Sequence, residues 1–305
     1  MNERQITAFR HVMRLGSVTA AARAMRVSQP AVSRHIADLE TDLGFPLFER
    51  RSGKLHPLPE AQTLEREVDR MFYGLDRLRA FAREMRGMAH AQISIASLPM
   101  ASFRILPRVV SSFLAKHPGI RVTHNVYTSA RIADLVGAGQ ADFGIAQLPP
   151  GRADVRRLAG WRCPCVVVLP AGHELGEAPL LTPEDLADVP LIALAHQTVT
   201  AAFLTERFSQ AGIAPKIIAE SQPSYAACGM VAEGLGATVV DPFTPSIFPE
   251  GVLTTVPFEP SIPFDVYLIG HPERAPSRAV QAMIGLVEEE FDRAAGADLR
   301  LKAGR

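Results

Sequence analysis

The chain has 305 residues, of which 47% are hydrophobic, and its 32 basic and 32 acidic side chains give a formal net charge of zero. This length predicts two or three domains with packed cores. The sequence contains no apolar run of roughly 18 residues and no apolar signal core near Met1. These absences exclude a helical membrane span and favour a cytoplasmic protein over an exported one.

The charge is unevenly distributed along the chain. Residues 1–58 hold nine Lys and Arg against five Asp and Glu, a net charge of +4, and the remainder carries −4. A basic N-terminal module fits a polyanionic partner such as DNA, more so if a dimer doubles the charge. The acidic remainder disfavours non-specific contact with DNA.

The N-terminal segment predicts a helix-turn-helix. Arg4–Leu15 has the spacing of a first helix, with Ile6, Phe9 and Met13 facing inward. An alanine-rich helix then breaks at Val27-Ser28. Ser28 can cap the next helix, Pro30 is tolerated in its first turn, and Gly44 is expected to end it. The second helix of such a pair lies in the DNA major groove, so the pattern predicts double-stranded DNA as a partner.

This second helix has an apolar stripe and a polar face. Val32, Ile36, Leu39 and Leu43 form the stripe, which we expect to pack against Ala20, Ala21 and Ala24. Gln, Arg and small apolar side chains on the other face suit base edges, although an ordinary solvated face is the alternative interpretation. The residues predicted to contact DNA in this helix are Ser28, Gln29, Pro30, Ala31, Ser33 and Arg34.

A basic hairpin is predicted after the second helix. Phe45–Phe48 is an apolar plug, and Glu49–Lys54 forms the tip of the hairpin. Phosphate contacts from such a tip add affinity without sequence information. The hairpin residues predicted to contact DNA are Arg50, Arg51 and Lys54.

Residues 1–60 resemble the winged helix-turn-helix of LysR-type transcriptional regulators. The resemblance rests on Gly16-Ser17, Ala20-Ala21-Ala22, the run from Val27 to Ser33, and Leu47–Arg50. Two positions depart from the family pattern: Lys54 replaces the usual Arg, and Ala61 replaces the usual Gly. It implies a DNA-binding domain at 1–58, a linker helix at 59–89 and an effector-binding domain at 90–305.

The linker segment has an apolar seam with heptad spacing. A heptad seam favours a coiled-coil partner, and it is about 32 Å long at the usual helical rise. Packing on the chain's own core is the weaker alternative, because no neighbouring segment offers a partner stripe. The predicted dimerisation residues are Leu64, Val68, Met71, Leu75, Leu78, Ala82 and Met85.

Residues 90–305 alternate between strand-like and helix-like segments, which predicts an α/β fold with parallel sheets covered by helices. The order resembles the two-subdomain, type II periplasmic-binding-protein-like domain of LysR-type regulators, with subdomain I at 90–162 and 267–305 and subdomain II at 163–266. The expected strands are 92–96, 121–127, 141–147, 165–169, 191–194, 216–220, 237–241 and 264–270. The expected helices are 103–117, 132–138, one starting at Thr182, 200–210, 224–233 and 275–295.

Polar residues follow the predicted strands, often at a helix start. In open α/β sheets ligands bind beyond the carboxyl ends of strands, and helix N-termini attract carboxylates. The alternative is that the Ser and Thr residues only cap helices. The predicted effector-binding residues are Ser97, Met100, Ser102, Thr128, Ser129, Gln147, His196, Gln197, Gln222, Ser224 and Asp241.

The stretches Cys228–Ala237 and Val240–Thr244 resemble regulators of opine and diaminopimelate or lysine metabolism. This resemblance implies an effector that is an amino acid derivative with carboxylates and an amine. Ser97, Ser102 and Ser129 would take a carboxylate, and Asp241 or Glu220 the amine.

The chemistry-bearing motifs of enzymes are missing from the sequence. There is no G-x-S-x-G, H-E-x-x-H or P-loop pattern, which predicts that the chain is not an enzyme. Cys163, Cys165 and Cys228 lack the spacing of a zinc site, so we expect core thiols, no metal and no cofactor.

Two protein classes other than a regulator also fit parts of the sequence. A solute-binding transport protein is disfavoured by the DNA-binding head and the missing signal peptide, and an architectural DNA-binding protein would lack effector binding. The family resemblance implies a homodimer or homotetramer whose effector alters the angle between DNA heads, with RNA polymerase as a possible partner and no membrane partner.

Overall fold

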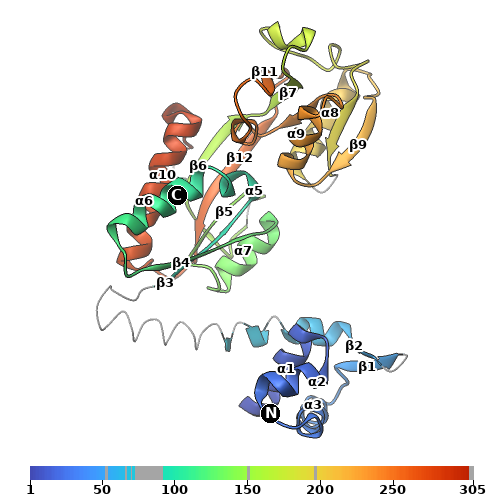
Figure 1. Ribbon diagram of the computed structural model, residues 1–305, viewed down its shortest axis with the longest axis vertical. Helices are drawn as coiled ribbons and strands as arrows, with labels where there is room; N and C mark the ends of the chain where they lie inside the picture. Colours follow the sequence, from blue (N-terminus) through green and yellow to red (C-terminus); the bar gives the residue numbers. More distant parts are fainter. Residues whose placement is uncertain are drawn as a thin grey trace. The chain divides into compact units, whose positions relative to one another are not determined.

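The structure is a computed structural model that describes residues 1–51, 54–65, 67–69, 71–72, 92–149, 152–195 and 198–301. The chain divides into two compact units, Met1–Ala82 and Arg83–Arg305 (Figure 1). Among the described residues, every helix is too short or too polar to cross a bilayer.

The first unit is three helices followed by a two-stranded hairpin. Phe9, Val12, Val32 and Leu39 are almost fully buried in one core. The predicted stripe therefore packs inward, with Ala21 and Ala22 opposite it; the expectation for Ala24 is wrong, because that side chain is exposed. The elements are α1 (Glu3–Leu15), α2 (Val18–Met25), α3 (Gln29–Leu43), β1 (Phe48–Arg51) and β2 (Lys54–Pro57).

Local capping defines the ends of α3. The Ser28 hydroxyl accepts a hydrogen bond from the Ala31 amide at 3.4 Å, and Gly44 ends the helix in the left-handed region with φ of 81°. The turn before α3 places Arg26 at φ of 56°, a conformation that costs energy for a residue other than glycine. The predicted break and stop of this helix are confirmed.

One carboxylate ties α3 to the hairpin. Glu40 Oε1 accepts hydrogen bonds from the amides of Leu47 and Phe48, at 2.7 and 3.1 Å. Leu47 is fully buried, as the predicted apolar plug requires, whereas Phe45 is 40% exposed and does not belong to it. The link from Glu40 keeps the start of β1 against the end of α3.

The described part of the linker is helical at 59–65, 67–69 and 71–72. Val68 is buried in the core of the head, and Leu64 and Phe72 pack against the same core. Arg10 binds Asp69 at 2.9 Å between Nε and Oδ1. The expectation that no neighbouring segment offers a partner stripe is therefore wrong for Leu64 and Val68.

Met71 is 39% exposed. The remaining seam residues, Leu75, Leu78, Ala82 and Met85, lie outside the described residues. Dimerisation through this helix stays a prediction.

A five-stranded sheet with the order β4-β3-β5-β12-β6 forms one half of the second unit. Helices α6 and α10 cover one face of the sheet, and α7 covers the other (Figure 1). The elements are β3 (Gln92–Ser97), α5 (Pro99–Ser102), α6 (Ile105–Lys116), β4 (Arg121–Val126), α7 (Ser129–Gly137), β5 (Phe143–Ala146), β6 (Arg156–Pro164), β12 (Pro263–Gly270) and α10 (Arg278–Ala295).

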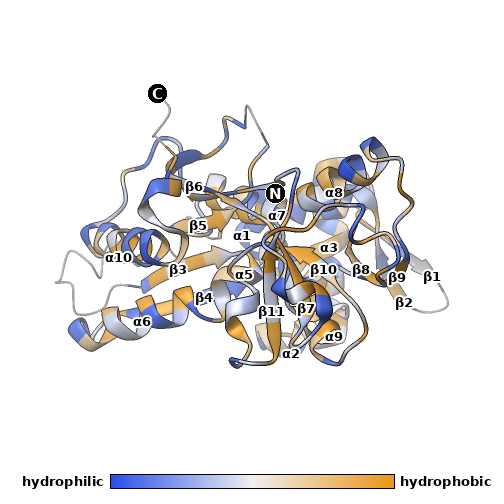
Figure 2. Cartoon of the chain, turned by 90° about the horizontal axis from the view of Figure 1, so that it is seen from above, coloured by the Kyte–Doolittle hydropathy of each residue, from blue (hydrophilic) through white to orange (hydrophobic). Residues whose placement is uncertain are grey.

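The other half of the second unit has a three-stranded sheet, β10-β7-β11, and a parallel pair, β8-β9. The pair joins β10 through the Ile192 amide, which donates to the Ala237 carbonyl at 2.8 Å. Figure 2 shows β7 and β10 as predominantly hydrophobic, in keeping with their burial. The elements are β7 (Val166–Pro170), β8 (Leu191–Leu194), α8 (Val199–Gln210), β9 (Ile217–Ser221), α9 (Ser224–Ala232), β10 (Thr238–Val240) and β11 (Leu253–Pro257).

Three sequence expectations for this unit are wrong. The two larger sheets are not parallel. The five-stranded sheet is mixed, because β12 runs antiparallel to β5 and β6, and the three-stranded sheet is antiparallel, because β7 runs antiparallel to β10 and β11. Strands β6 and β11 were not predicted. The helix expected from Thr182 is only a turn, in which the Asp185 carboxylate accepts from the Thr182 amide and hydroxyl. Pro190 keeps the preceding residue out of the helical region and limits the segment to turns.

Candidate DNA-recognition helix and effector site

Helix α3 presents its predicted DNA-contacting residues to solvent. Ser28, Gln29 and Pro30 are exposed, Ala31 and Ser33 are partly exposed, and the Arg34 side chain is 84% exposed. Arg34 has one surface neighbour, Asp38, at 3.9 Å, and an ion pair of this kind contributes little. The guanidinium is therefore available for a base edge or a phosphate.

The β1-β2 hairpin places the predicted phosphate-contacting residues in neighbouring positions. Arg51 is paired in register with Lys54, and Arg50 with Leu55. The backbone of the hairpin thus gathers three basic residues next to its turn, as a wing requires.

The carboxyl ends of β4, β3 and β5 meet at one edge of the first sheet. The Tyr127 amide donates to the Ser97 carbonyl at 3.1 Å, and the Leu98 amide to the Ile145 carbonyl at 3.0 Å. Ser129 Oγ accepts from the Gln147 amide at 3.1 Å. The structure therefore brings together the predicted residues of this subdomain, which are Ser97, Met100, Ser102, Thr128, Ser129 and Gln147.

The hydroxyls at this edge differ in their access to solvent. Ser97 is fully buried, whereas Ser102 and Ser129 are partly exposed and Thr128 is exposed. Thr128 precedes α7 without capping it through its side chain. A ligand approaching the edge therefore meets Ser102, Thr128 and Ser129, and Ser97 lies behind them.

His124 lies on β4 beside Ser97 and was not among the predicted effector-binding residues. Its Nε2 is 2.8 Å from Ser97 Oγ, which is also 3.0 Å from Ser102 Oγ. Burial lowers the pKa of His124 below its ordinary value of 6.5. The alternation of β4 puts His124 on the same face as Val122. The register pairs His124 with Ile95 of β3, so Ser97, two residues further along β3, is its diagonal neighbour.

The carboxyl ends of β8, β9 and β10 form the corresponding edge in the other half of the unit. The Ala195 amide donates to the Ser221 carbonyl at 3.0 Å. Gln222 is exposed, and Ser224 is partly exposed at the start of α9. The predicted residues His196 and Gln197 lie outside the described residues.

Asp241 is 2% exposed, and its carboxylate accepts hydrogen bonds from its own loop and from the Ser224 side chain on α9. Its oxygens accept from the Phe243 amide at 3.1 Å, the Thr244 amide at 2.9 Å and the Thr244 hydroxyl at 2.8 Å. Burial raises the pKa of Asp241, although these hydrogen bonds act in the opposite direction. These contacts account for the Asp241 carboxylate without a ligand. Glu220, the other residue expected to take the amine, is exposed.

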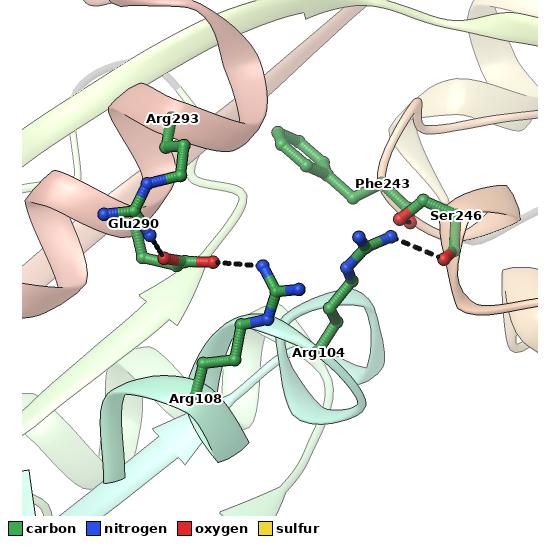
Figure 3. Close-up of polar contacts among 6 residues, drawn as sticks. All are labelled: Arg104, Arg108, Phe243, Ser246, Glu290 and Arg293. Atoms are coloured by element: carbon green, nitrogen blue, oxygen red, sulfur yellow. Dashed lines mark hydrogen bonds and ion pairs between the residues drawn. The ribbon is translucent and has the colours of Figure 1, made fainter. Parts of the chain in front are cut away.

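Direct contacts join the two halves of the second unit beside α5 and α9. The Phe103 ring stacks on Tyr225 with centroids 4.7 Å apart, and Tyr225 stacks on Phe248 at 5.0 Å. Arg104 Nη1 donates to the Ser246 carbonyl at 2.8 Å (Figure 3). Phe103 was expected inside a helix, but α6 begins only at Ile105, and the preceding corner reaches the other half.

A second arginine of the same helix faces α10. Arg108 Nη1 lies 3.1 Å from Glu290 Oε1, and Arg293 binds the other oxygen of that buried carboxylate (Figure 3). Arg104 and Arg108 thus hold α6 between the Ser246 loop and α10.

The three cysteines are buried core residues. Burial raises the pKa of Cys163 to about 12 and that of Cys228 to about 12, and it raises the pKa of Cys165 further. Within the described part of the chain, no three His, Cys, Asp or Glu side chains gather into a cluster able to hold a metal ion.

Because only the thiolate reacts readily, native alkylation by iodoacetamide at about pH 8 should be about 100-fold or more slower than in guanidinium. Mass spectrometry over time measures the rate at each cysteine. Native labelling of Cys163 at the unfolded rate would contradict this burial.

Two family models match the chain. Residues 4–62 match the bacterial regulatory helix-turn-helix protein model of the lysR family, and residues 86–292 match the LysR substrate binding domain. The chain belongs to the LysR family of transcriptional regulators. The predicted family and fold class are thereby confirmed.

Curated relatives and a solved structure agree with this assignment. The transcriptional activator protein LysR of Escherichia coli K12 is 34% identical over 285 residues, covering 93% of this chain and 92% of that protein. The octopine catabolism/uptake operon regulatory protein OccR of Rhizobium meliloti is 35% identical over 246 residues, covering 79% and 80%. Full-length CbnR, crystallised with its target DNA, has a similar fold, with a TM-score of 0.70 at 21% identity, covering 97% of this chain and 100% of that chain.

As a LysR-family member, the chain is a DNA-binding transcriptional regulator with an effector-binding domain. Its partners are operator DNA, a small-molecule effector and further copies of itself. The predicted function and partners are confirmed at this level.

Proposed function

We propose that this LysR-type regulator responds to an amino acid derivative that bears carboxylates and an amine. The observation that carries the proposal is the 35% identity to OccR, whose name places it at an octopine catabolism and uptake operon. We further propose that the chain works in the cytoplasm and has no catalytic activity, since its matched models and relatives are regulators.

The site chemistry supports a carboxylate ligand. Ser102, Thr128 and Ser129 offer hydroxyls at one edge of the sheet, next to the first turn of α7. The free amides of a helix start and its dipole both favour an anion. On the opposite edge, Gln222 and Ser224 would complete the site, and Glu220 would take the amine.

For DNA, we propose that α3 lies in the major groove and that the hairpin lies on the backbone. Gln29 suits an adenine edge, Arg34 suits guanine, and Pro30 and Ala31 can touch a thymine methyl. Arg50, Arg51 and Lys54 would contact phosphates. The exposure of α3 supports this arrangement.

For assembly, we propose that the linker helix pairs two chains from Met71 onward, because Leu64 and Val68 pack on the head. The proposed boundaries remain 1–58, 59–89 and 90–305, with subdomains at 90–162 plus 267–305 and at 163–266. A dimer of dimers that also contacts RNA polymerase is part of the proposal.

An effector can act only if it binds one arrangement of the subdomains more tightly than another. The stack of Phe103, Tyr225 and Phe248 joins the two halves directly beside Ser224. A ligand that contacts both edges would therefore alter the geometry of this stack and the spacing of the DNA heads.

A thermal-shift screen of the full-length chain tests the effector class. We expect octopine, meso-diaminopimelate or L-lysine to raise the melting temperature in a dose-dependent, saturating way, because a ligand of the folded state stabilises it. A screen in which only compounds outside this class, such as aromatic acids, stabilise the chain would overturn the proposal.

Ser129→Ala should weaken binding of the stabilising compound about tenfold while leaving DNA affinity unchanged, because it removes one donor to a carboxylate. Ser112→Ala, on the exposed side of α6, is the matched control and should bind like the unaltered chain. Isothermal titration calorimetry measures both, and equal affinities for the two variants would count against Ser129 as a contact.

A further inference from the structure

A hydrogen-bonded group on β3, α5 and β4 lies behind the exposed hydroxyls of the effector edge. His124 Nε2, Ser97 Oγ and Ser102 Oγ follow one another at 2.8 and 3.0 Å. Both hydroxyls also lie 3.0 Å from the Leu98 carbonyl oxygen. Ser97 is fully buried in this group, and Ser102 and His124 are partly exposed.

The number of protons available selects one direction for these bonds. Four contacts join the group: His124 to Ser97, Ser97 to Ser102, and each serine to the Leu98 carbonyl. If His124 carries its proton on Nε2, three of the four contacts have a proton, and the bonds run from His124 through Ser97 and Ser102 to the Leu98 carbonyl. If the proton sits on Nδ1, Ser97 must donate to His124, and two contacts are left without a proton.

Burial disfavours the charged form of the His124 ring in the absence of a ligand. Strand β3 and helix α5 carry no charged side chain, and the pKa of His124 is lowered by burial alone. At the start of α6, Arg104 binds the Ser246 carbonyl and Arg108 binds Glu290. Lys116 and His117 lie at the C-terminal end of this helix. Arg121 is exposed at the start of β4.

We propose that His124 is a positioning residue of the effector site. His124 Nε2–H donates to the Ser97 hydroxyl, which in turn donates to Ser102 Oγ. The Ser102 hydroxyl can then donate to an effector carboxylate in place of the Leu98 carbonyl. The bound carboxylate in turn favours a second proton on the His124 ring, so effector binding is coupled to proton uptake. This inference rests on the proposed carboxylate effector.

The direction of the pH dependence follows from this coupling. Without a ligand, the pKa of His124 lies below 6.5, and an anion nearby raises it. Protons are then taken up on binding in the window between the two pKa values, and affinity rises as the pH falls through that window. We expect binding to be about three- to tenfold tighter at pH 5.5 than at pH 7.5.

Calorimetry of the full-length chain with the stabilising compound in buffers of different ionisation enthalpy measures the proton uptake. The unaltered chain should take up a fraction of a proton, and His124→Gln, which keeps a donor to Ser97 but cannot titrate, should take up none. The variant should also lose the pH dependence while binding within about threefold of the unaltered chain at pH 7.5. His117→Gln is the matched control and should behave like the unaltered chain.

Nitrogen-15 NMR of the His124 ring in the absence of any ligand tests the tautomer independently of effector binding. The expected state near pH 7.5 is the neutral Nε2–H tautomer, and an Nδ1–H tautomer would overturn the inference. If a probe binds without His124-dependent proton uptake, the inference is wrong and the effector class stands. If octopine, meso-diaminopimelate and L-lysine all fail to bind, the effector class is wrong, and the tautomer still decides the role of His124.

Discussion

Replacing Arg34 with alanine should lower operator affinity about tenfold to a hundredfold without unfolding the head. A bidentate contact between arginine and a base is worth about 1–3 kcal/mol. The Arg34 side chain is 84% exposed and its ion pair with Asp38 is long, at 3.9 Å, so its removal leaves the core of α3 unchanged. Fluorescence anisotropy with the operator and with an unrelated duplex, at one salt concentration, measures the loss.

Arg131→Ala is the matched control for this prediction. It removes the same charge from an exposed position on α7, in the other unit of the chain. The control should bind the operator like the unaltered chain, and Arg34→Ala should lose more affinity for the operator than for the unrelated duplex. Equal losses on both duplexes would make Arg34 a phosphate contact rather than a base contact.

Replacing Trp161 with alanine should destabilise the second unit by about 3–5 kcal/mol, the usual cost of deleting a buried tryptophan. Trp161 is fully buried on β6, stacks on Phe291 with centroids 4.6 Å apart, and donates from Nε1 to Asp292 Oδ1 at 2.8 Å. It therefore joins the sheet to α10. Urea denaturation followed by circular dichroism measures the change.

Trp161→Phe separates the packing contribution from the hydrogen bond. The phenyl ring keeps the stack on Phe291, and Asp292 keeps its ion pair with Arg300 at 2.9 Å. We expect a loss of only about 1–2 kcal/mol. If the alanine and phenylalanine variants lose the same stability, the ring stack contributes nothing and the account of the β6-α10 contact is wrong.

The features that could be predicted from the sequence are those decided by neighbouring residues. Ser28 and Gly44 mark the ends of α3 because capping depends on a few adjacent groups. The burial of Val32 and Leu39 follows from helical spacing alone. The same spacing in the linker did not predict that Val68 packs on the head, since its partner surface comes from residues distant in sequence.

The features that could not be predicted depend on pairing across the chain. Strand β6 does not alternate in sequence, and it is recognisable only beside β12. The capping pattern at Thr182 and Asp185 forms a turn because Pro190 follows too soon for a helix. The contact of Ser97 with His124 depends on how β3 and β4 pair. The hydrogen bonds of Asp241 to Phe243 and Thr244 depend on a loop conformation that buries the carboxylate.

The most direct test of the central claim is the binding of the full-length chain to promoter DNA with and without a saturating amino acid derivative, measured by anisotropy and footprinting at fixed salt. The account predicts selective binding at one promoter site and a change in affinity or in the footprint when the compound is added. Equal affinity for all duplexes, or a compound that binds the chain and leaves its DNA complex unchanged, would contradict it.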